Sequence, residues 1–170
     1  PTAFGGVNVS VAASTFTDAA GNGNNASSTF TWNYNDGIVG SDDPPGTFQF
    51  THTFFAAHGV TPDPDRVIKS PWLSILDPVV SQLGGSGWRI KANMGPRTLD
   101  IRRNKFHIDF PNITTAVYFI NTNNGWTEFQ NGDKVESVAN RIVIFDSNTM
   151  HTGTTCTNEK VRVLINFNYA

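Results

Sequence analysis

The sequence has little of what several common protein classes require. It contains one cysteine, which excludes an internal disulfide and a zinc cluster built from several cysteines. No apolar run approaches the roughly 20 residues that a membrane helix needs, and the first residues lack the basic-then-apolar order of a signal peptide. These absences predict a soluble protein in a reducing, cytoplasmic compartment with no membrane partner.

An excess of charge of one sign is also lacking. The chain has 12 Lys and Arg against 14 Asp and Glu, which gives a formal net charge of -2. A basic patch, the usual electrostatic sign of nucleic-acid binding, is not evident, so we expect no nucleic-acid partner. Because 170 residues is the size of one domain with a core of its own, we expect a single domain over 1–170.

Residues that form helices at regular spacing are scarce, whereas Gly, Asn, Ser, Thr, Val and Phe are plentiful. This composition favours strands joined by turns. We predict strands at 30–34, 47–55, 88–93, 105–110, 114–121, 126–130, 134–138, 141–146 and 161–169. Many short strands separated by turns rich in Asn and Gly are typical of a jelly roll, so the expected fold class is mainly β, a double-stranded β-helix.

One helix is predicted over about 71–83. Ser70 can cap it, Pro71 suits its first position, and the glycines at 84 and 85 end it. Apolar side chains recur along it at three- and four-residue spacing, which predicts that one stripe of the helix packs against a sheet. The predicted stripe consists of Trp72, Ile75, Leu76, Val79, Val80 and Leu83.

A candidate metal site lies in the second half of the chain. If 105–110 is a strand, His107 and Asp109 are two residues apart and face the same side. His151 follows the apolar strand 141–146 in a loop that a jelly roll can bring back beside that pair. Two imidazoles and one carboxylate on one face leave positions open for an oxoacid and O₂, as Fe(II) oxygenases require.

Arg162 is the fourth candidate residue, because it lies within the predicted strand 161–169. Its guanidinium is always charged and matches a carboxylate in shape, so an Arg that points into a barrel calls for an anionic partner. The distal carboxylate of 2-oxoglutarate is one such partner. A structural ion pair with Glu159 or Asp146 is the alternative.

With these residues in place, the second half of the chain resembles the prolyl-4-hydroxylase-like 2-oxoglutarate/Fe(II) oxygenases, of the kind found in bacteriophage and bacteria. The segments that carry the resemblance are WRIKANM (88–94), FHIDF (106–110), TAVYFINTNNGWTEF (115–129), NRIVIFDSNTMHTG (140–153) and VRVLINFNY (161–169). It implies an Fe(II)- and 2-oxoglutarate-dependent dioxygenase that hydroxylates its substrate, with ascorbate as a further cofactor candidate. It also implies that His107, Asp109 and His151 bind iron and that Arg162 binds the oxoacid.

The same resemblance implies two supporting contacts to the oxoacid. Asn93 precedes the metal motif on a strand, and a Tyr commonly assists the Arg, which makes Tyr118 the second candidate. Strand parity argues against Tyr118, since Val117 and Phe119 would share the opposite face. The substrate is a protein or a small molecule, with peptidyl proline as the family-level expectation and the loops 18–46 and 95–105 as its expected contacts.

Two other classes remain open at this stage. A non-catalytic jelly-roll module of phage type, structural or carbohydrate-binding, would share the β-rich composition but would not need Arg162 inside the barrel. A cupin-like metal enzyme would use the same fold with a different cosubstrate. His52 and His58 lack a third ligand at suitable spacing, so we expect them in packing or on the surface.

Overall fold

Two antiparallel sheets and a short helical segment make up the part of the chain that the computed structural model describes, which is residues 6–9, 30–35, 49–57 and 67–170. The main sheet has the order β1-β2-β3-β5-β11-β6-β9, with β4 beside β3, and the second has the order β10-β7-β8. The strands are β1 (Gly6–Val9), β2 (Phe30–Asn35), β3 (Gln49–Ala56), β4 (Ile68–Lys69), β5 (Gly87–Pro96), β6 (Thr114–Phe119), β7 (Trp126–Phe129), β8 (Lys134–Glu136), β9 (Ile142–Asp146), β10 (His151–Gly153) and β11 (Val161–Tyr169).

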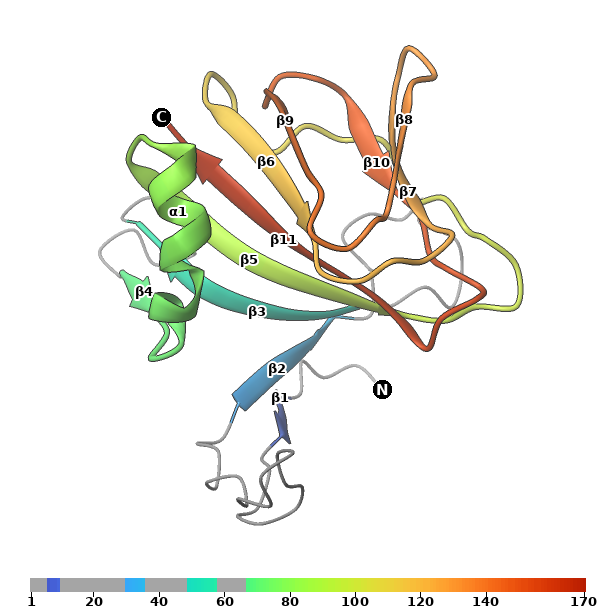
Figure 1. Cartoon of the computed structure of the whole chain (residues 1–170), viewed down its shortest axis with the longest axis horizontal. Coiled ribbons are helices and arrows are strands. Elements are labelled where there is room, and N and C mark those ends of the chain that lie inside the picture. The colour runs from blue at the N-terminus through green and yellow to red at the C-terminus, as the bar shows by residue number, and fades with distance from the viewer. Residues whose placement is uncertain (1–5, 10–29, 36–48, 58–66) are drawn as a thin grey trace, which may run out of the picture.

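The helix and the small sheet flank the main sheet (Figure 1). On the helix side, a buried cluster joins the helical segment to the centre of the main sheet; it contains Phe54, Leu76, Ile90, Ala92, Ala116, Ile165 and Phe167. On the side of the small sheet, Val117, Phe119 and Leu164 form a second cluster against Val135 of β8. This architecture confirms the predicted mainly β jelly roll. Among the described residues, no helix has the length and apolar character to span a bilayer.

Strand parity divides β5 between these two sides. Ile90 and Ala92 are buried in the cluster on the helix side, whereas Arg89, Lys91 and Asn93 line a cavity on the opposite face. Such alternation follows from the two-residue period of a strand. Each face of β5 therefore has its own role, one in the core and one in the cavity.

The predicted helix is present as a 3₁₀ turn, η1 (Leu73–Leu76), followed by α1 (Asp77–Leu83). The Oγ atom of Ser70 accepts a hydrogen bond from the backbone N–H of Trp72 at 3.2 Å, and Gly84, with φ of 67°, follows the last turn. The predicted glycine stop is therefore confirmed. The predicted cap is not, because η1 begins after Trp72 and α1 after Leu76 and neither has a side-chain cap hydrogen bond. Ser70 instead bonds within the turn that precedes η1.

The predicted apolar stripe is correct in part. Leu76 is buried, and Trp72, Val79 and Leu83 pack against the core on the helix side. The prediction was wrong for Ile75 and Val80, which are 60% and 37% exposed. The physical reason is the 3₁₀ start, whose three residues per turn align Leu73 with Leu76. Leu73 therefore packs on the sheet in place of Ile75.

The predicted strand over 105–110 was wrong. Within this segment one isolated bridge forms, between His107 and His151, and a second, between Arg103 and Thr154, lies just before it. His151, predicted to lie in a loop, begins β10, which pairs with β7. The backbone N–H and C=O groups of His107 both bond to His151, at 2.9 and 3.0 Å. Pro111 follows the segment, and because it has no N–H it cannot donate to a strand ladder there.

Candidate metal centre and cavity

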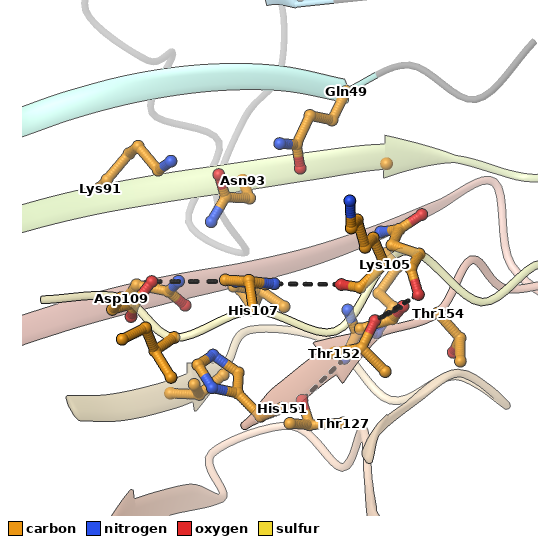
Figure 2. A pocket seen from close by; sticks show the side chains of 18 of the residues that line it. Gln49, Lys91, Asn93, Lys105, His107, Asp109, Thr127, His151, Thr152 and Thr154 are labelled. Atoms are coloured by element: carbon orange, nitrogen blue, oxygen red, sulfur yellow. Dashed lines mark hydrogen bonds and ion pairs between the residues drawn. The ribbon is translucent and has the colours of Figure 1, made fainter. Parts of the chain in front are cut away.

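A cavity of about 450 Å³ opens over the face of the main sheet opposite the helix. Its walls come from β5 and β11 of the main sheet, from β7 and β10 of the small sheet, and from the irregular segment 104–110. Three of the four principal candidates, His107, Asp109 and His151, lie together in it, as Figure 2 shows. Arg162 lines the same cavity. The structure therefore brings together residues that are far apart in the sequence.

The ligand atoms of His107, Asp109 and His151 all lie within 4.8 Å of one another, an arrangement that could hold a metal ion. His151 is buried, and the side chain of Asp109 is only 6% exposed. The ring centroids of the two histidines are 4.6 Å apart. The gathering arises because the bridge between His107 and His151 holds the irregular segment against β10, and not from the strand parity that the sequence suggested.

Hydrogen bonds fix which nitrogen each histidine offers. The Nδ1 atom of His107 lies 3.2 Å from the carbonyl oxygen of Lys105, and Nδ1 of His151 lies 2.9 Å from that of Thr149. A carbonyl oxygen only accepts, so each Nδ1 donates its proton and Nε2 of the neutral ring keeps a free lone pair. Metal-binding histidines in proteins are commonly held in this way.

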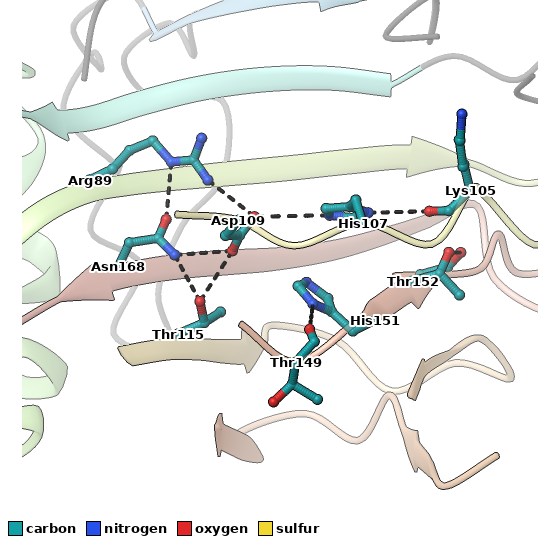
Figure 3. Close-up of polar contacts among 10 residues, drawn as sticks. Arg89, Lys105, His107, Asp109, Thr115, Thr149, His151, Thr152 and Asn168 are labelled. Atoms are coloured by element: carbon teal, nitrogen blue, oxygen red, sulfur yellow. Dashed lines mark hydrogen bonds and ion pairs between the residues drawn. The ribbon is translucent and has the colours of Figure 1, made fainter. Parts of the chain in front are cut away.

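The carboxylate of Asp109 is held by three side chains from the main sheet (Figure 3). Asn168 and Thr115 donate hydrogen bonds to Oδ2 at 3.0 and 3.3 Å, and Arg89 approaches Oδ1 at 3.4 Å. Burial alone would raise the pKa of Asp109, but the bond from Asn168 and the charge of Arg89 outweigh it, and the pKa lies below its usual value. Asp109 is therefore an oriented anion, as a metal ligand must be.

The surroundings of His151 keep its ring neutral. Burial lowers the pKa of His151 below its usual value, although the bond to the carbonyl of Thr149 acts in the opposite direction. The ring of Phe145 packs against His151 with centroids 4.8 Å apart. A neutral imidazole at physiological pH is the form that binds a metal.

Arg162 is buried, with 6% of its surface exposed, and its hydrogen-bond partners in the described part of the chain are neutral. Its Nε donates to Oγ of Ser137 at 2.9 Å, and a terminal nitrogen lies 3.4 Å from Oγ1 of Thr127. Neither Glu159 nor Asp146 forms an ion pair with it, so the structural alternative is not observed. Burial lowers the pKa of Arg162 to about 10, and the guanidinium is still charged at neutral pH.

Two glycines make room for the Arg162 side chain. A Cβ atom added to Gly125 would lie 2.8 Å from Cδ of Arg162 and 2.7 Å from the carbonyl oxygen of Thr155. One added to Gly153 would lie 3.3 Å from a terminal nitrogen of the guanidinium. Sequence reasoning placed Gly125 in the turn NTNNG (121–125) and gave Gly153 no role, because the approach of Arg162 to both glycines is a contact between distant parts of the chain that local pattern does not show.

The two supporting candidates have different outcomes. Asn93 lines the cavity, and its buried Oδ1 accepts no hydrogen bond from the described residues. The hydroxyl of Tyr118 instead donates to Oδ1 of Asn140 at 2.8 Å, and its ring packs on the helix side. The structure therefore does not place Tyr118 in the cavity, as strand parity indicated, and Val117 lines it instead.

The other histidines and the substrate loops are placed only in part. Nε2 of His52 lies 3.0 Å from Oγ of Ser70, and the ring packs edge-on against Phe54, away from the cavity lining. His58 lies outside the described residues. The same holds for most of the expected substrate loop 18–46, whereas Asn104 in the second loop lines the cavity.

Comparisons with known proteins agree on the fold. No family model matches the sequence, and no curated protein matches it. A solved oxidoreductase of the 2OG-Fe(II) oxygenase family from Burkholderia pseudomallei matches with a TM-score of 0.53 and 10% identity, over 75% of this chain and 71% of that chain. The ethanolamine utilization protein EutQ of Salmonella typhimurium LT2, described as putative, gives 0.48 and 9% identity over 98% and 97%. A prolyl-4-hydroxylase from Pseudomonas putida gives 0.40 and 13% identity over 75% and 77%.

Of these three structures, the one from Burkholderia pseudomallei has a TM-score above 0.5, and at 10% identity that similarity supports the double-stranded β-helix fold alone. The neighbours include 2-oxoglutarate oxygenases, but also EutQ and a cupin described as RmlC-like. One fold hosts many chemistries, so the function has to be argued from the residues in the cavity.

Proposed function

We propose that this protein is an Fe(II)- and 2-oxoglutarate-dependent oxygenase that hydroxylates its substrate. The observation that carries the proposal is the combination of two features in one cavity. The first is the group His107, Asp109 and His151, with its ligand atoms within 4.8 Å. The second is Arg162, a buried cation whose hydrogen-bond partners in the described part of the chain are neutral.

The donor set fits Fe(II). Two neutral imidazoles and one carboxylate are ligands that this metal accepts, and three protein ligands leave positions free for other molecules. The same donors also suit a catalytic zinc site. Arg162 favours the oxygenase over a zinc enzyme, because a buried guanidinium beside an open metal site provides the anchor that an oxoacid needs for its far carboxylate.

When bound, Fe(II) with 2-oxoglutarate and O₂ would supply the oxidising power for hydroxylation of a C–H bond, with release of succinate and CO₂. The residues of the chain would supply position and polarity. Asn168 and Thr115 orient the carboxylate of Asp109, and the carbonyls of Lys105 and Thr149 hold the two imidazoles. His151 and the side chain of Asp109 are largely withdrawn from water, which strengthens the electrostatic contacts that they make, whereas His107 lies on the open side of the centre.

The proposal can be tested without knowledge of the substrate. Anaerobic addition of Fe(II) and 2-oxoglutarate to the protein should produce a weak visible charge-transfer band. His151→Ala should abolish the band, whereas His52→Ala, which alters a histidine outside the cavity, should retain it. Absence of the band from the wild type, or an unchanged band in His151→Ala, would contradict the proposal.

Turnover distinguishes the remaining classes. A succinate-release screen, with and without iron and with or without ascorbate, should include proline-rich peptides, free amino acids and modified bases. An oxygenase releases succinate with at least one of them, and peptidyl proline is the first candidate. A cupin-like enzyme with another cosubstrate would keep its activity in Arg162→Met, because it has no oxoacid to anchor.

A further inference from the structure

We propose that the substrate of this cavity carries an acidic group, a carboxylate or a phosphate, and that Lys91 binds it. The inference rests on the proposed oxygenase function and adds the chemical class of the molecule to be oxidised. The residues that carry it are Lys91 and its cross-strand neighbour Asn166, which both line the cavity.

Lys91 is a cation that has no hydrogen-bond or ion-pair partner among the described residues. It lies on the cavity face of β5. Burial, followed by the neighbouring charge of Arg89, lowers the pKa of Lys91 to about 8, so the ammonium is mostly protonated at neutral pH. A charged group that is partly withdrawn from water and left unpaired is unfavourable unless a ligand completes it.

No acidic side chain among the described residues of the cavity pairs with the ammonium of Lys91. Asp109 is the one acidic residue among the described residues that line the cavity, and Arg89 already pairs with Asp109. The proposed function assigns the distal carboxylate of the oxoacid to Arg162. Lys91 is then a half-buried cation of the cavity for which the described residues provide no anion.

Lys91 and Arg162 are well separated along the sheet. On β11, Arg162 pairs with Gly95 and Asn166 pairs with Lys91, so the two cations lie four residues apart in register. At a rise of about 3.3 Å per residue this corresponds to roughly 13 Å between backbone positions. In Figure 2, Lys91 and Asn93 lie on one side of His107 and Asp109, and His151 lies on the other. This separation favours two different acidic groups over a single oxoacid held at both ends.

Asn166 adds a second indication of a ligand. Its Oδ1 is buried and accepts no hydrogen bond from the described residues, and the same is true of Oδ1 of Asn93. Buried polar atoms in folded proteins are almost always paired, so two such acceptors in one cavity call for donors on a bound molecule. The expected substrate therefore carries N–H or O–H groups near its acidic group.

The test uses the full chain loaded with Ni(II) and 2-oxoglutarate, so that Arg162 is occupied and no oxidation occurs. Acetate and inorganic phosphate are titrated by calorimetry into the wild type, Lys91→Met and Lys91→Arg. Lys134→Met is the matched control, because Lys134 lies over the ring of Trp126 outside the cavity lining. We expect Lys91→Met to weaken anion binding at least tenfold, the loss of about one charge-assisted hydrogen bond. Lys91→Arg should stay close to the wild type, and Lys134→Met should match it.

The outcomes separate this inference from the proposed function. The anion that binds more tightly identifies the acidic group as a carboxylate or a phosphate. Equal anion affinities in wild type and Lys91→Met would overturn the inference, as would a loss in Lys91→Met of 2-oxoglutarate affinity instead of anion affinity. If the wild type cannot be loaded with metal and 2-oxoglutarate, the proposed function fails. The anions are then titrated into metal-free Arg162→Met protein, where dependence on Lys91 supports the inference and its absence overturns it.

Discussion

Replacement of Arg162 by Met should stabilise the protein and weaken its binding of 2-oxoglutarate. Arg162 is 6% exposed and is held by Ser137 and Thr127, which are neutral. A methionine can fill much of the same space without a charge. Burial of the charged guanidinium lowers the stability of the folded state, and a bound carboxylate would offset this loss. Stability and affinity should therefore change in opposite directions.

The size of the stability change follows from the pKa. Burial lowers the pKa of Arg162 from its usual high value to about 10, so below pH 10 the folded state carries a cation that it disfavours by about 3 kcal/mol. This cost falls only as the pH rises through the folded pKa toward the unfolded one. The substitution removes that cost but also removes two hydrogen bonds worth about 1 kcal/mol each. The net expectation is a gain of about 1 kcal/mol, or a rise in Tm of roughly 2–4 °C.

Two measurements on metal-free and Ni(II)-loaded protein check this expectation. Urea unfolding gives the stability change, and calorimetric titration of 2-oxoglutarate should show roughly 10- to 150-fold weaker binding in Arg162→Met, the range for one charge-assisted interaction. Arg141→Met, at an exposed arginine, should alter stability by less than about 0.5 kcal/mol and leave oxoacid affinity unchanged. If Arg162→Met is clearly less stable and binds 2-oxoglutarate like the wild type, Arg162 is a structural residue and the reasoning is wrong.

Three further predictions concern the surroundings of the centre. Asn168→Ala should lower metal affinity about 10- to 100-fold, because Asp109 loses the hydrogen bond that orients it, and Co(II) titration measures the loss. Gly125→Ala should lower the free energy of unfolding, measured with urea, by about 1–3 kcal/mol, because the added Cβ would lie less than 3 Å from backbone and side-chain atoms. Gly95→Ala is the control and should cost much less, because no atom lies within 4 Å of its added Cβ. The pKa of Lys91 is lowered to about 8, so anion binding should be full below that pH and should decline as the pH rises through it. Calorimetry at pH 7 and pH 9 should show this decline in the wild type and not in Lys91→Arg, whose guanidinium stays charged.

The sequence was sufficient for the fold class and for the helix. Its strands alternate visibly, and the helix between Ser70 and Gly84 has local signals at both ends. The sequence did not show which residues of the helix face the sheet, because the same residues can start a 3₁₀ turn or an α-helical turn. Ile75 is exposed because the 3₁₀ turn forms, and packing of the segment against the sheet determines that choice.

The metal-binding candidates were found for a reason that is only partly correct. Parity within a strand over 105–110 led to His107 and Asp109, yet the segment is irregular and is positioned by its bridge to His151. That bridge is a contact across 44 residues, which local pattern cannot show. The partners of Asp109 could have been approached from sequence, because Asn168 lies an even number of residues from Arg162 on β11 and so shares its face.

The inner face of β11 explains why these residues occur together. β11 pairs with β5 on one side and β6 on the other, so its backbone is fixed at the centre of the main sheet. A central strand that faces a protein interior is expected to be apolar, and Leu164 follows that rule. Arg162, Asn166 and Asn168 do not. Asn168 orients Asp109, Asn166 has a buried acceptor that no described residue fills, and Arg162 is the anchor for the oxoacid in the function we propose. Because side chains on a rigid strand keep their spacing, β11 would fix the distances between metal, oxoacid and substrate in the function we propose.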